Sequence, residues 1–305
     1  MIELVKNTKI DFMGLRRYAF AFSGVLLILG IVGTVQIYRG QANLGIDLAG
    51  GTSIQLKVGK PFSLNEIRTI LARSGHGEAT LQEVPGENIL LLKLGATGKQ
   101  EEKMVADPVV NLLRQSLPGN PFVVESVSEI GPAIGHKLRQ DAALALLVSA
   151  LAIILYLAWR FEFKFGVAAA IATFHDVFII VGIFWALGIE MDLLFITALL
   201  TIGGYSLTDT VVVFDRIREN IRFRKKGTFS EAINLSVNEV LSRTIITSLT
   251  TFIAVASLIV FGGIVLRNFA LALAMGIVIG TYSSIFVASP VVALWRGEKM
   301  TEVKR

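Results

Sequence analysis

The chain has 305 residues, of which 53% are hydrophobic and only 17% are charged. A soluble domain usually carries about 25% charged residues, so the composition argues against a purely soluble protein. The net charge is +5, and the absence of cysteine excludes disulfides and thiolate chemistry.

The apolar residues are gathered into six long runs. A helix of about 20 apolar residues spans a bilayer core, and only helices and closed barrels satisfy their own backbone polar groups in lipid. Runs of this length predict six transmembrane helices, at residues 18–38, 142–159, 165–188, 193–214, 244–266 and 268–295. The first run is longer than a signal-peptide core, and no small-x-small cleavage site follows it, so we interpret it as a retained anchor.

The basic residues predict the orientation of these helices. If the N-terminus is cytoplasmic, the inside segments hold 4, 2, 7 and 4 lysines and arginines; these segments are 1–17, 160–164, 215–243 and 296–305. The short outside loops, 189–192 and 262–268, hold none and one. The positive-inside rule therefore places both termini in the cytoplasm. It also explains the basic loop without a nucleic-acid partner.

Residues 39–141 separate the first two predicted spans and carry 11 basic and 11 acidic residues, a balanced soluble surface. The pattern predicts strand, helix, strand, strand, helix, strand, which is the order of the ferredoxin-like α+β fold. Strands are expected at 53–58, 79–84, 88–94 and 122–130, and helices at 63–74 and 99–117. Ser63 with Glu66 predicts a capping box on the first helix, and Pro108 predicts a kink or break in the second. The resulting domain is expected to lie outside the cytoplasm.

The Gly-rich stretch 45–52 superficially resembles a phosphate-binding loop. It lacks the Gly-Lys-Ser/Thr ending that places a lysine on phosphate, and it leads into a strand. We interpret it as a tight turn into the outside domain. No ATPase motif is found elsewhere, so we expect no direct use of ATP. We also expect no enzymatic activity, no cofactor and no metal.

Two acids fall inside predicted spans. An ionisable side chain at the centre of a membrane helix costs at least about 2.5–3.5 kcal/mol on insertion scales, so it usually has a partner and a function. Asp176 follows His175 about ten residues into the third span, which places it near the middle of the bilayer. Asp209 lies in the fourth span, six residues before Asp215, and so roughly 9 Å from the cytoplasmic boundary.

A polar stripe runs along the fourth span toward Asp209. Thr197, Thr201, Tyr205 and Asp209 recur every fourth residue, and Thr208 lies beside them. This spacing places the four residues on one helix face.

The fifth span begins with Arg243 and continues with Thr247, which lies about 6 Å further along the helix. Consecutive spans are antiparallel, so Asp209, Arg243 and Thr247 can form a cluster at one depth. If the effects of burial and of the nearby arginine nearly cancel, the carboxyl titrates near neutral pH, as a proton relay needs. The spacing thus indicates a proton-relay site, with Asp176, His175, Tyr205 and Thr208 as possible secondary members.

Structural interpretations of the same residues remain open at this point. Threonine and serine in spans often join helices by hydrogen bonds and close packing. Asp209 and Arg243 can form a static ion pair, and Asp176 can be held by His175 or a neighbouring helix without any transport role. The small residues at 272, 276, 280 and 284 in the sixth span indicate packing only.

The cytoplasmic loop 215–243 has a helical pattern of its own. Thr228 and Glu231 predict a second capping box, and the apolar residues that follow fall on one side of a helix. We interpret this segment as an interfacial amphipathic helix, or alternatively as a docking helix for a partner subunit.

Four segments form longer motifs: 10–14 (IDFMG), 45–52 (GIDLAGGT), 130–135 (IGPAIG) and 204–220 (GYSLTDTVVVFDRIREN). The last is long and highly specific. Through these segments, and over essentially its whole length, the chain resembles the SecF family of protein-export membrane subunits. Thr208 stands where many relatives have asparagine, and it retains a hydrogen-bonding side chain beside Asp209.

The resemblance implies a polytopic protein of the bacterial cytoplasmic (inner) membrane, in the resistance–nodulation–division superfamily. It implies a homologous SecD-like subunit and the SecY–SecE–SecG translocon as partners, with unfolded preprotein as the passenger and the proton motive force as the energy source. Sodium is not excluded as the coupling ion. In the family, residues matching Asp209, Arg243 and Thr247 are linked to proton movement. The alternatives are a small-molecule efflux half-transporter of the same superfamily and a non-transporting translocon scaffold.

Overall fold

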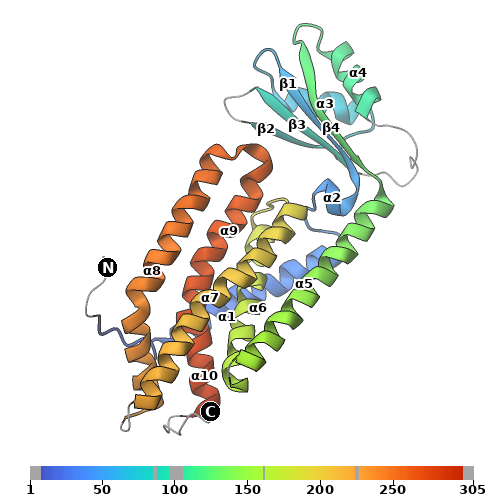
Figure 1. Ribbon diagram of the computed structural model, residues 1–305. Coiled ribbons are helices and arrows are strands. Elements are labelled where there is room, and N and C mark those ends of the chain that lie inside the picture. Colours follow the sequence, from blue (N-terminus) through green and yellow to red (C-terminus); the bar gives the residue numbers. More distant parts are fainter. Residues whose placement is uncertain (1–7, 85–87, 96–105, 161, 224–226, 298–305) are drawn as a thin grey trace. The chain divides into compact units, whose positions relative to one another are not determined.

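A computed structural model describes residues 8–84, 88–95, 106–160, 162–223 and 227–297 of the chain. The chain forms two compact units. One consists of Leu44–Leu144, and the other combines Met1–Asn43 with Ala145–Arg305. Figure 1 shows that the first unit contains the β-sheet and the second is helical.

Six helical segments of the described chain are long and apolar enough to cross a membrane, as the sequence predicts. They are α1 (Arg16–Tyr38), α5 (Pro132–Arg160), α6 (Phe163–Ala186), α7 (Leu193–Phe223), α8 (Phe229–Phe261) and a last composite segment. The composite consists of α9 (Gly263–Ser283), the π-helix η1 (Ser284–Ala288) and α10 (Ser289–Arg296). One helix precedes the sheet-containing segment and five accompany or follow it, so the one-plus-five layout is confirmed.

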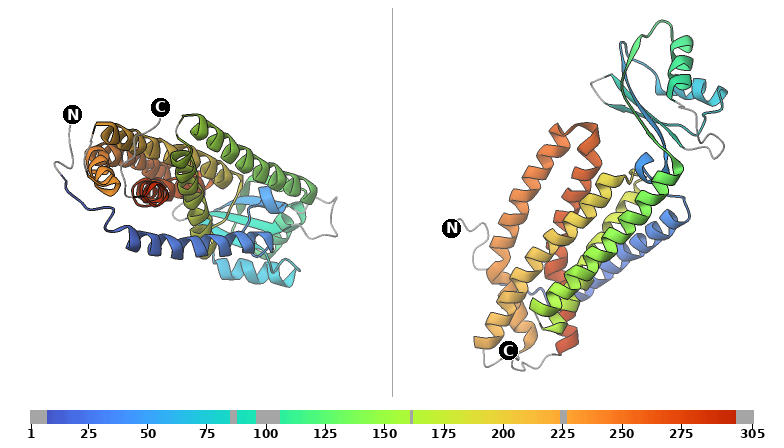
Figure 2. Two further views of the ribbon diagram at one scale, coloured as in Figure 1. Left: turned by 90° about the horizontal axis from the view of Figure 1, so that it is seen from below. Right: turned by 45° about the vertical axis from the view of Figure 1, so that its right-hand side comes forward.

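Glycines allow α1 and α6 to pack closely against each other. α1 packs along α6 (Figure 2). A Cβ added to Gly182 of α6 would meet the backbone of Gly30 in α1, and one added to Gly33 would meet Trp185 and Gly182. Small residues at such a contact let two helix backbones approach closely.

The segment between α7 and α8 differs from its prediction. α7 continues to Phe223 and α8 begins at Phe229, so the expected loop 215–243 is largely a continuation of two spans. The second capping box is confirmed, because Glu231 N donates to Thr228 Oγ1 at 3.2 Å and Thr228 N donates to the Glu231 carboxylate at 3.3 Å.

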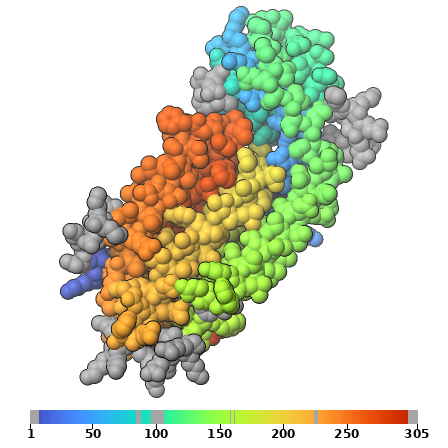
Figure 3. All heavy atoms as spheres, viewed as in Figure 1, coloured from blue at the N-terminus to red at the C-terminus, as the bar shows by residue number. Residues whose placement is uncertain are grey.

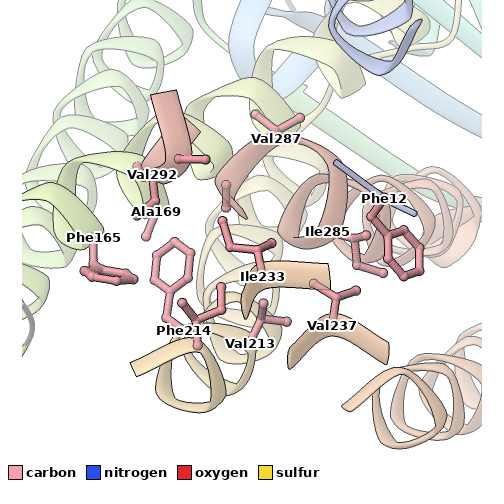
Figure 4. Close-up of a cluster of buried hydrophobic side chains, with 14 of the residues drawn as sticks. Phe12, Phe165, Ala169, Val213, Phe214, Ile233, Val237, Ile285, Val287 and Val292 are labelled. Atoms are coloured by element: carbon pink, nitrogen blue, oxygen red, sulfur yellow. The ribbon is translucent and has the colours of Figure 1, made fainter. Parts of the chain in front are cut away.

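The apolar face of this helix is not available to lipid or to a partner. Phe229, Ile233 and Val237 are at most 1% exposed and pack in one cluster with Phe214 of α7 (Figure 4). The predictions of an interfacial or docking helix are therefore wrong. The helical periodicity is present, but the chain itself covers the apolar stripe.

The segment before α1 completes this cluster. Phe12 and Met13 are buried in it, and the Phe12 ring lies 5.6 Å from that of Phe286 in η1. Two asparagines of α8 bind the same segment. Asn238 accepts from Ile10 N at 3.0 Å and donates to Ile10 O at 2.9 Å, while Asn234 accepts from Met13 N at 2.9 Å.

The sheet has four antiparallel strands in the order β2-β3-β1-β4, with bounds β1 (Gly51–Val58), β2 (Thr80–Val84), β3 (Ile89–Gly95) and β4 (Phe122–Ile130). Two helices, α3 (Leu64–Arg73) and α4 (Ala106–Ser116), join them in the split βαβ order. Alternate residues of β1 and β3 form a core with both helices, including Ile54, Leu92 and Leu113. The ferredoxin-like topology is confirmed.

One local prediction in this unit is wrong. Ser63 makes no side-chain hydrogen bond at the start of α3, so the first capping box does not form. Pro108 is the third described residue of α4, and the kink or break expected there stays a prediction. The earlier part of that predicted helix, 99–105, lies outside the described residues.

The Gly-rich stretch forms a one-turn helix, α2 (Ile46–Ala49), followed by Gly50 and Gly51 with φ of +78° and +144°. A Cβ on Gly51 would meet the carbonyl oxygen of Leu94. Positive φ and this close approach both require glycine. The pair therefore turns the chain into β1, which fits the tight turn expected from the sequence.

Candidate functional site

Asp209 lies on α7 with 8% of its surface exposed, and its nearest polar partner is on α8. Ser248 Oγ donates to Asp209 Oδ2 at 3.3 Å. Ser248 Oγ is also 2.7 Å from Thr281 Oγ1 of α9, and Thr281 donates to the carbonyl oxygen of Ile277 at 2.7 Å. The carboxylate is thus the first member of a hydroxyl chain that crosses three helices and ends on a backbone carbonyl.

The other two predicted members lie near Asp209 without bonding to it. Arg243 is exposed and close enough to act electrostatically on Asp209, but the described residues include no ion pair between them within 4.0 Å. Thr247 Oγ1 donates to the backbone carbonyls of Arg243 at 3.1 Å and Thr244 at 2.9 Å. In this arrangement, therefore, neither residue makes the contact with Asp209 that the sequence suggested.

Only part of the polar stripe of α7 faces outward from its own chain. Thr197, Thr201 and Thr208 are exposed, and each donates to the carbonyl four residues earlier. The Tyr205 hydroxyl is buried and has no hydrogen-bond partner in the described residues. Figure 3 shows α7 and α8 side by side on one surface of the helical unit. The three threonines and Arg243 are thus exposed polar residues on two helices that are long and apolar enough to span a membrane.

Asp176 belongs to a second cluster. It is fully buried on α6 and accepts from Ser206 of α7 at 2.5 Å and from Ser283 of α9 at 2.8 Å. His175 Nδ1 lies 2.9 Å from its other oxygen, and His175 Nε2 lies 3.0 Å from Ser23 Oγ of α1. His175 and Asp176 are brought together as the sequence placed them, but they do not contact Asp209.

Close helix packing explains why both clusters use α7 and α9. A Cβ on Gly276 would overlap the Ile202 side chain, and one on Gly280 would lie 3.0 Å from the Cβ of Ser206. The packing interpretation of the small residues in the sixth span is therefore consistent with the structure. It brings Thr281 and Ser283 within reach of α8 and of Asp176, respectively.

Four polar partners were missed by reasoning from the sequence: Ser248, Thr281, Ser206 and Ser283. Ser248 directly follows Thr247, and an i, i+4 stripe drawn through Arg243 selects the neighbouring face. Ser206 lies one turn before Asp209. Only Ser206 lies on a helix that carries one of the two buried acids, and the other three lie on α8 and α9. A search for hydroxyls on every face of α7, α8 and α9, rather than on one stripe, includes all four.

Comparison with known proteins assigns most of the chain to a described family. Residues 113–298 match the family described as "Protein export membrane protein SecD/SecF, C-terminal", and residues 42–61 match the "SecD/SecF GG Motif". The second match covers the Gly50–Gly51 turn. A protein translocase subunit SecF of Thermodesulfovibrio yellowstonii is 51% identical over 96% of this chain and 97% of its own length. One of Calditerrivibrio nitroreducens is 42% identical over 96% of each.

A solved structure shares the fold. The crystal structure of SecDF, a translocon-associated membrane protein from Thermus thermophilus, is 37% identical and covers 97% of this chain with a TM-score of 0.82. A SecDF structure in a super-membrane-facing form gives a TM-score of 0.70 with the same identity and coverage. The chain spans only 40% of each of these SecDF chains.

Proposed function

Because the chain belongs to the SecD/SecF family of protein-export membrane proteins, we propose that it works as an auxiliary subunit of the Sec translocase in which Asp209 couples the proton motive force to export. The observation that carries the coupling is the contact of Asp209 with the hydroxyl chain of Ser248 and Thr281. The role in protein export follows from the family. The efflux alternative has no support from these relatives.

The hydroxyl chain suits both protonation states of Asp209. When the carboxyl is ionised, Ser248 donates to it. When it is protonated, it donates to Ser248, which donates to Thr281, which donates to the Ile277 carbonyl. A hydroxyl is both donor and acceptor, so the chain reverses by rotation of C–O bonds. Neither state leaves the carboxyl without a partner.

Arg243 supplies the change in charge balance. Its guanidinium carries a fixed positive charge on α8, and Asp209 on α7 alternates between neutral and negative. The ionised carboxylate draws Arg243 toward it, and the protonated carboxyl releases it. Thr247 lies one turn from Arg243 on α8, and we assign it a part in the movement of this helix. One charge crossing a potential of 100 mV is worth roughly 2.3 kcal/mol, which is enough to bias two packings of α7 and α8.

The polar surface of α7 and α8 supports a membrane-embedded partner. An exposed arginine and several hydroxyls are costly against lipid, and a second set of helices that covers them removes this cost. We assign this position to a SecD-like subunit. The solved SecDF chain is consistent with this, because more than half of it has no counterpart here. Association with a SecY–SecE–SecG translocon and with unfolded preprotein belongs to the same proposal.

The topology completes the proposal. The chain is a multi-pass membrane protein, placed in the bacterial inner membrane with both termini in the cytoplasm. The basic residues near the ends of α7 and α10, such as Arg216 and Arg296, fit the cytoplasmic side of that orientation. The unit Leu44–Leu144 then lies outside the cytoplasm, on the side where translocated preprotein emerges.

The test measures preprotein export into inverted membrane vesicles with and without an imposed proton gradient. Asp209→Asn keeps the shape of the side chain but cannot release a proton, so the stimulation by the gradient is lost. Asp141→Asn, an exposed residue of α5, is the matched control and keeps the stimulation. Full stimulation in Asp209→Asn at equal protein levels would favour the scaffold alternative. Replacing the proton gradient with a sodium gradient identifies the coupling ion.

A further inference from the structure

The second buried carboxylate has no role in the proposed coupling, yet it has the more complete set of partners. Asp176 is fully buried and accepts from Ser206 of α7 and Ser283 of α9. Its other carboxyl oxygen lies 2.9 Å from His175 Nδ1 on its own helix, α6. His175 is 3% exposed. A histidine–carboxylate pair this deep in a membrane protein is costly unless its charge is balanced.

The other ring nitrogen of His175 leads to the first span. Nε2 lies 3.0 Å from Ser23 Oγ, and Ser23 Oγ lies 3.1 Å from the hydroxyl of Tyr282. The Tyr282 hydroxyl donates to the carbonyl oxygen of Ala19 at 2.9 Å. The chain of contacts therefore runs from α6 to α1, on to α9, and back to the backbone of α1.

Counting hydrogens points to the number of protons that the pair holds. The network has six contacts, and we assign one hydrogen to each. Ser283 Oγ also lies 3.1 Å from the carbonyl oxygen of Gly280, so its single hydrogen is shared between that oxygen and Asp176. Four hydroxyls supply one each: Ser23, Tyr282, Ser206 and Ser283. The Ala19 carbonyl and the ionised carboxylate only accept. Two hydrogens must therefore come from His175 and Asp176 together.

We propose that His175 and Asp176 form a buried two-proton site with no net charge, separate from the site at Asp209. Its state is either an imidazolium beside a carboxylate or a neutral imidazole beside a carboxylic acid. In both forms Nε2 carries a hydrogen that it donates to Ser23. Ser23 then donates to Tyr282, and Tyr282 donates to the carbonyl oxygen of Ala19. Each member of this chain therefore donates to the next one, and every contact has a hydrogen.

The surroundings support a site without net charge. The titratable group that faces the pair from α9 is Tyr282, whose ring stacks on that of His175 at 6.3 Å. α1 contributes Ser23 and α7 contributes Ser206, neither of which carries a charge. Asp209 of α7 faces α8 instead. With one proton, the pair would leave a net negative charge that none of these facing groups compensates.

Loss of one proton also has a mechanical consequence. With Nε2 unprotonated, Ser23 donates to the ring and no longer to Tyr282, so the Tyr282 hydroxyl must choose between Ser23 and the Ala19 carbonyl. One of the contacts that tie α1 to α9 is then lost. The proton count of a pair on α6 thus controls the attachment of α1. This does not depend on Asp209 being the proton carrier.

The proton count can be measured directly on the full-length chain in lipid bilayers. The chain has three histidines; His76 and His136 lie in the sheet-containing unit, so the double variant His76→Gln/His136→Gln leaves His175 as the single histidine. Nitrogen-15 NMR at neutral pH then shows which ring nitrogens are protonated. The infrared difference between this variant and the same variant with Asp176→Asn shows whether Asp176 is a carboxylate or a carboxylic acid.

Two results support the proposal: both nitrogens protonated with an ionised Asp176, or Nε2 alone protonated with a protonated Asp176. An unprotonated Nε2 overturns it, as does a single ring hydrogen beside an ionised carboxylate. Ser23→Ala removes the acceptor of the Nε2 hydrogen, so the protonated fraction at Nε2 falls. Ser257→Ala makes the same chemical change on α8, and the fraction stays as in the parent. An unchanged fraction in Ser23→Ala would break the proposed link to α1.

Discussion

The hydroxyl of Ser248 lies 3.3 Å from a carboxylate oxygen of Asp209, whereas the Thr247 hydroxyl beside it is bonded to its own helix. Adjacent residues on α8 therefore differ in their contacts. Ser248 is buried and bonds to Asp209, whereas Thr247 is exposed.

This difference predicts unequal effects of two alanine variants. Ser248→Ala removes the only side-chain hydrogen bond to Asp209 found in the described residues. A hydrogen bond to a charged group is worth about 1.5–3 kcal/mol, so gradient-stimulated export is expected to fall on the order of tenfold. Thr247→Ala is expected to lose less. The measurement is export into vesicles with an imposed proton gradient, and a larger loss in Thr247→Ala contradicts the prediction.

Asp176 is expected to be essential for stability. Asp176→Leu removes the acceptor of two buried serine hydroxyls and the partner of His175 Nδ1. Breaking a buried pair in this way costs about 3–5 kcal/mol. Reversible unfolding in detergent, followed by circular dichroism, should show this loss. Asp141→Leu, on an exposed face of α5, is the control and should change the free energy of unfolding by less than about 0.5 kcal/mol.

The contact between α1 and α6 predicts a sharp contrast between two glycines of one helix. A Cβ at Gly30 would overlap the backbone carbonyl of Phe178, whereas a Cβ at Gly24 has open space around it. Gly30→Ala should therefore destabilise the helical unit by about 1–3 kcal/mol, as overpacking does. Gly24→Ala should leave it unchanged or slightly more stable. The measurement is the thermal unfolding midpoint of the two variants in the same detergent. Equal midpoints would contradict the prediction.

The segment before α1 should respond to acid through Asp11. The Gly14 amide donates to Asp11 at 2.9 Å and Asn234 at 2.7 Å, and these bonds lower the pKa of the Asp11 carboxyl below its ordinary value. A lowered pKa means that the stabilisation is complete above the ordinary value of about 4 and is lost as the pH falls through the lowered one.

Hydrogen exchange at the Gly14 amide measures this effect. Exchange corrected for its intrinsic pH dependence should accelerate only below about pH 4 in the wild type. In Asp11→Ala it should be fast at every pH. A protected Gly14 amide in Asp11→Ala would show that Asn234 and Asn238 hold the segment without the carboxylate.

The sequence predicts the membrane architecture well, because hydropathy and length depend only on composition along the chain. The order of strands and helices between the first two spans was equally accessible, since the alternation in β1 and the apolar stripe of α3 reflect which faces are buried. Asp176 and Asp209 are recognisable in the sequence because an acid within a membrane span is costly and usually has a partner or a function.

The contacts of those acids were less accessible. Which face of α8 turns toward α7 depends on the rotation of α8 about its own axis, which its sequence pattern does not specify. A rotation of one residue exchanges Thr247 for Ser248. The amphipathic start of α8 shows the same limit. Its apolar residues were identified, but their partners Phe12 and Phe214 are distant in sequence, so lipid was expected where the chain covers itself.

The π-helix η1 rotates α10 relative to α9 about the axis of the last span, so the two helices direct their side chains to different neighbours. A π turn contains one residue more than an α turn, and one residue corresponds to about 100° of rotation. α9 can therefore direct Ser283 to Asp176, while α10 directs Val292 into the apolar cluster around Phe165 (Figure 4). Deleting one residue within Ser284–Ala288 would hardly shorten the span. It would turn the apolar face of α10 out of that cluster. The number of residues in η1 is therefore constrained by the rotation that α10 needs about the helix axis, and not by the thickness of the bilayer.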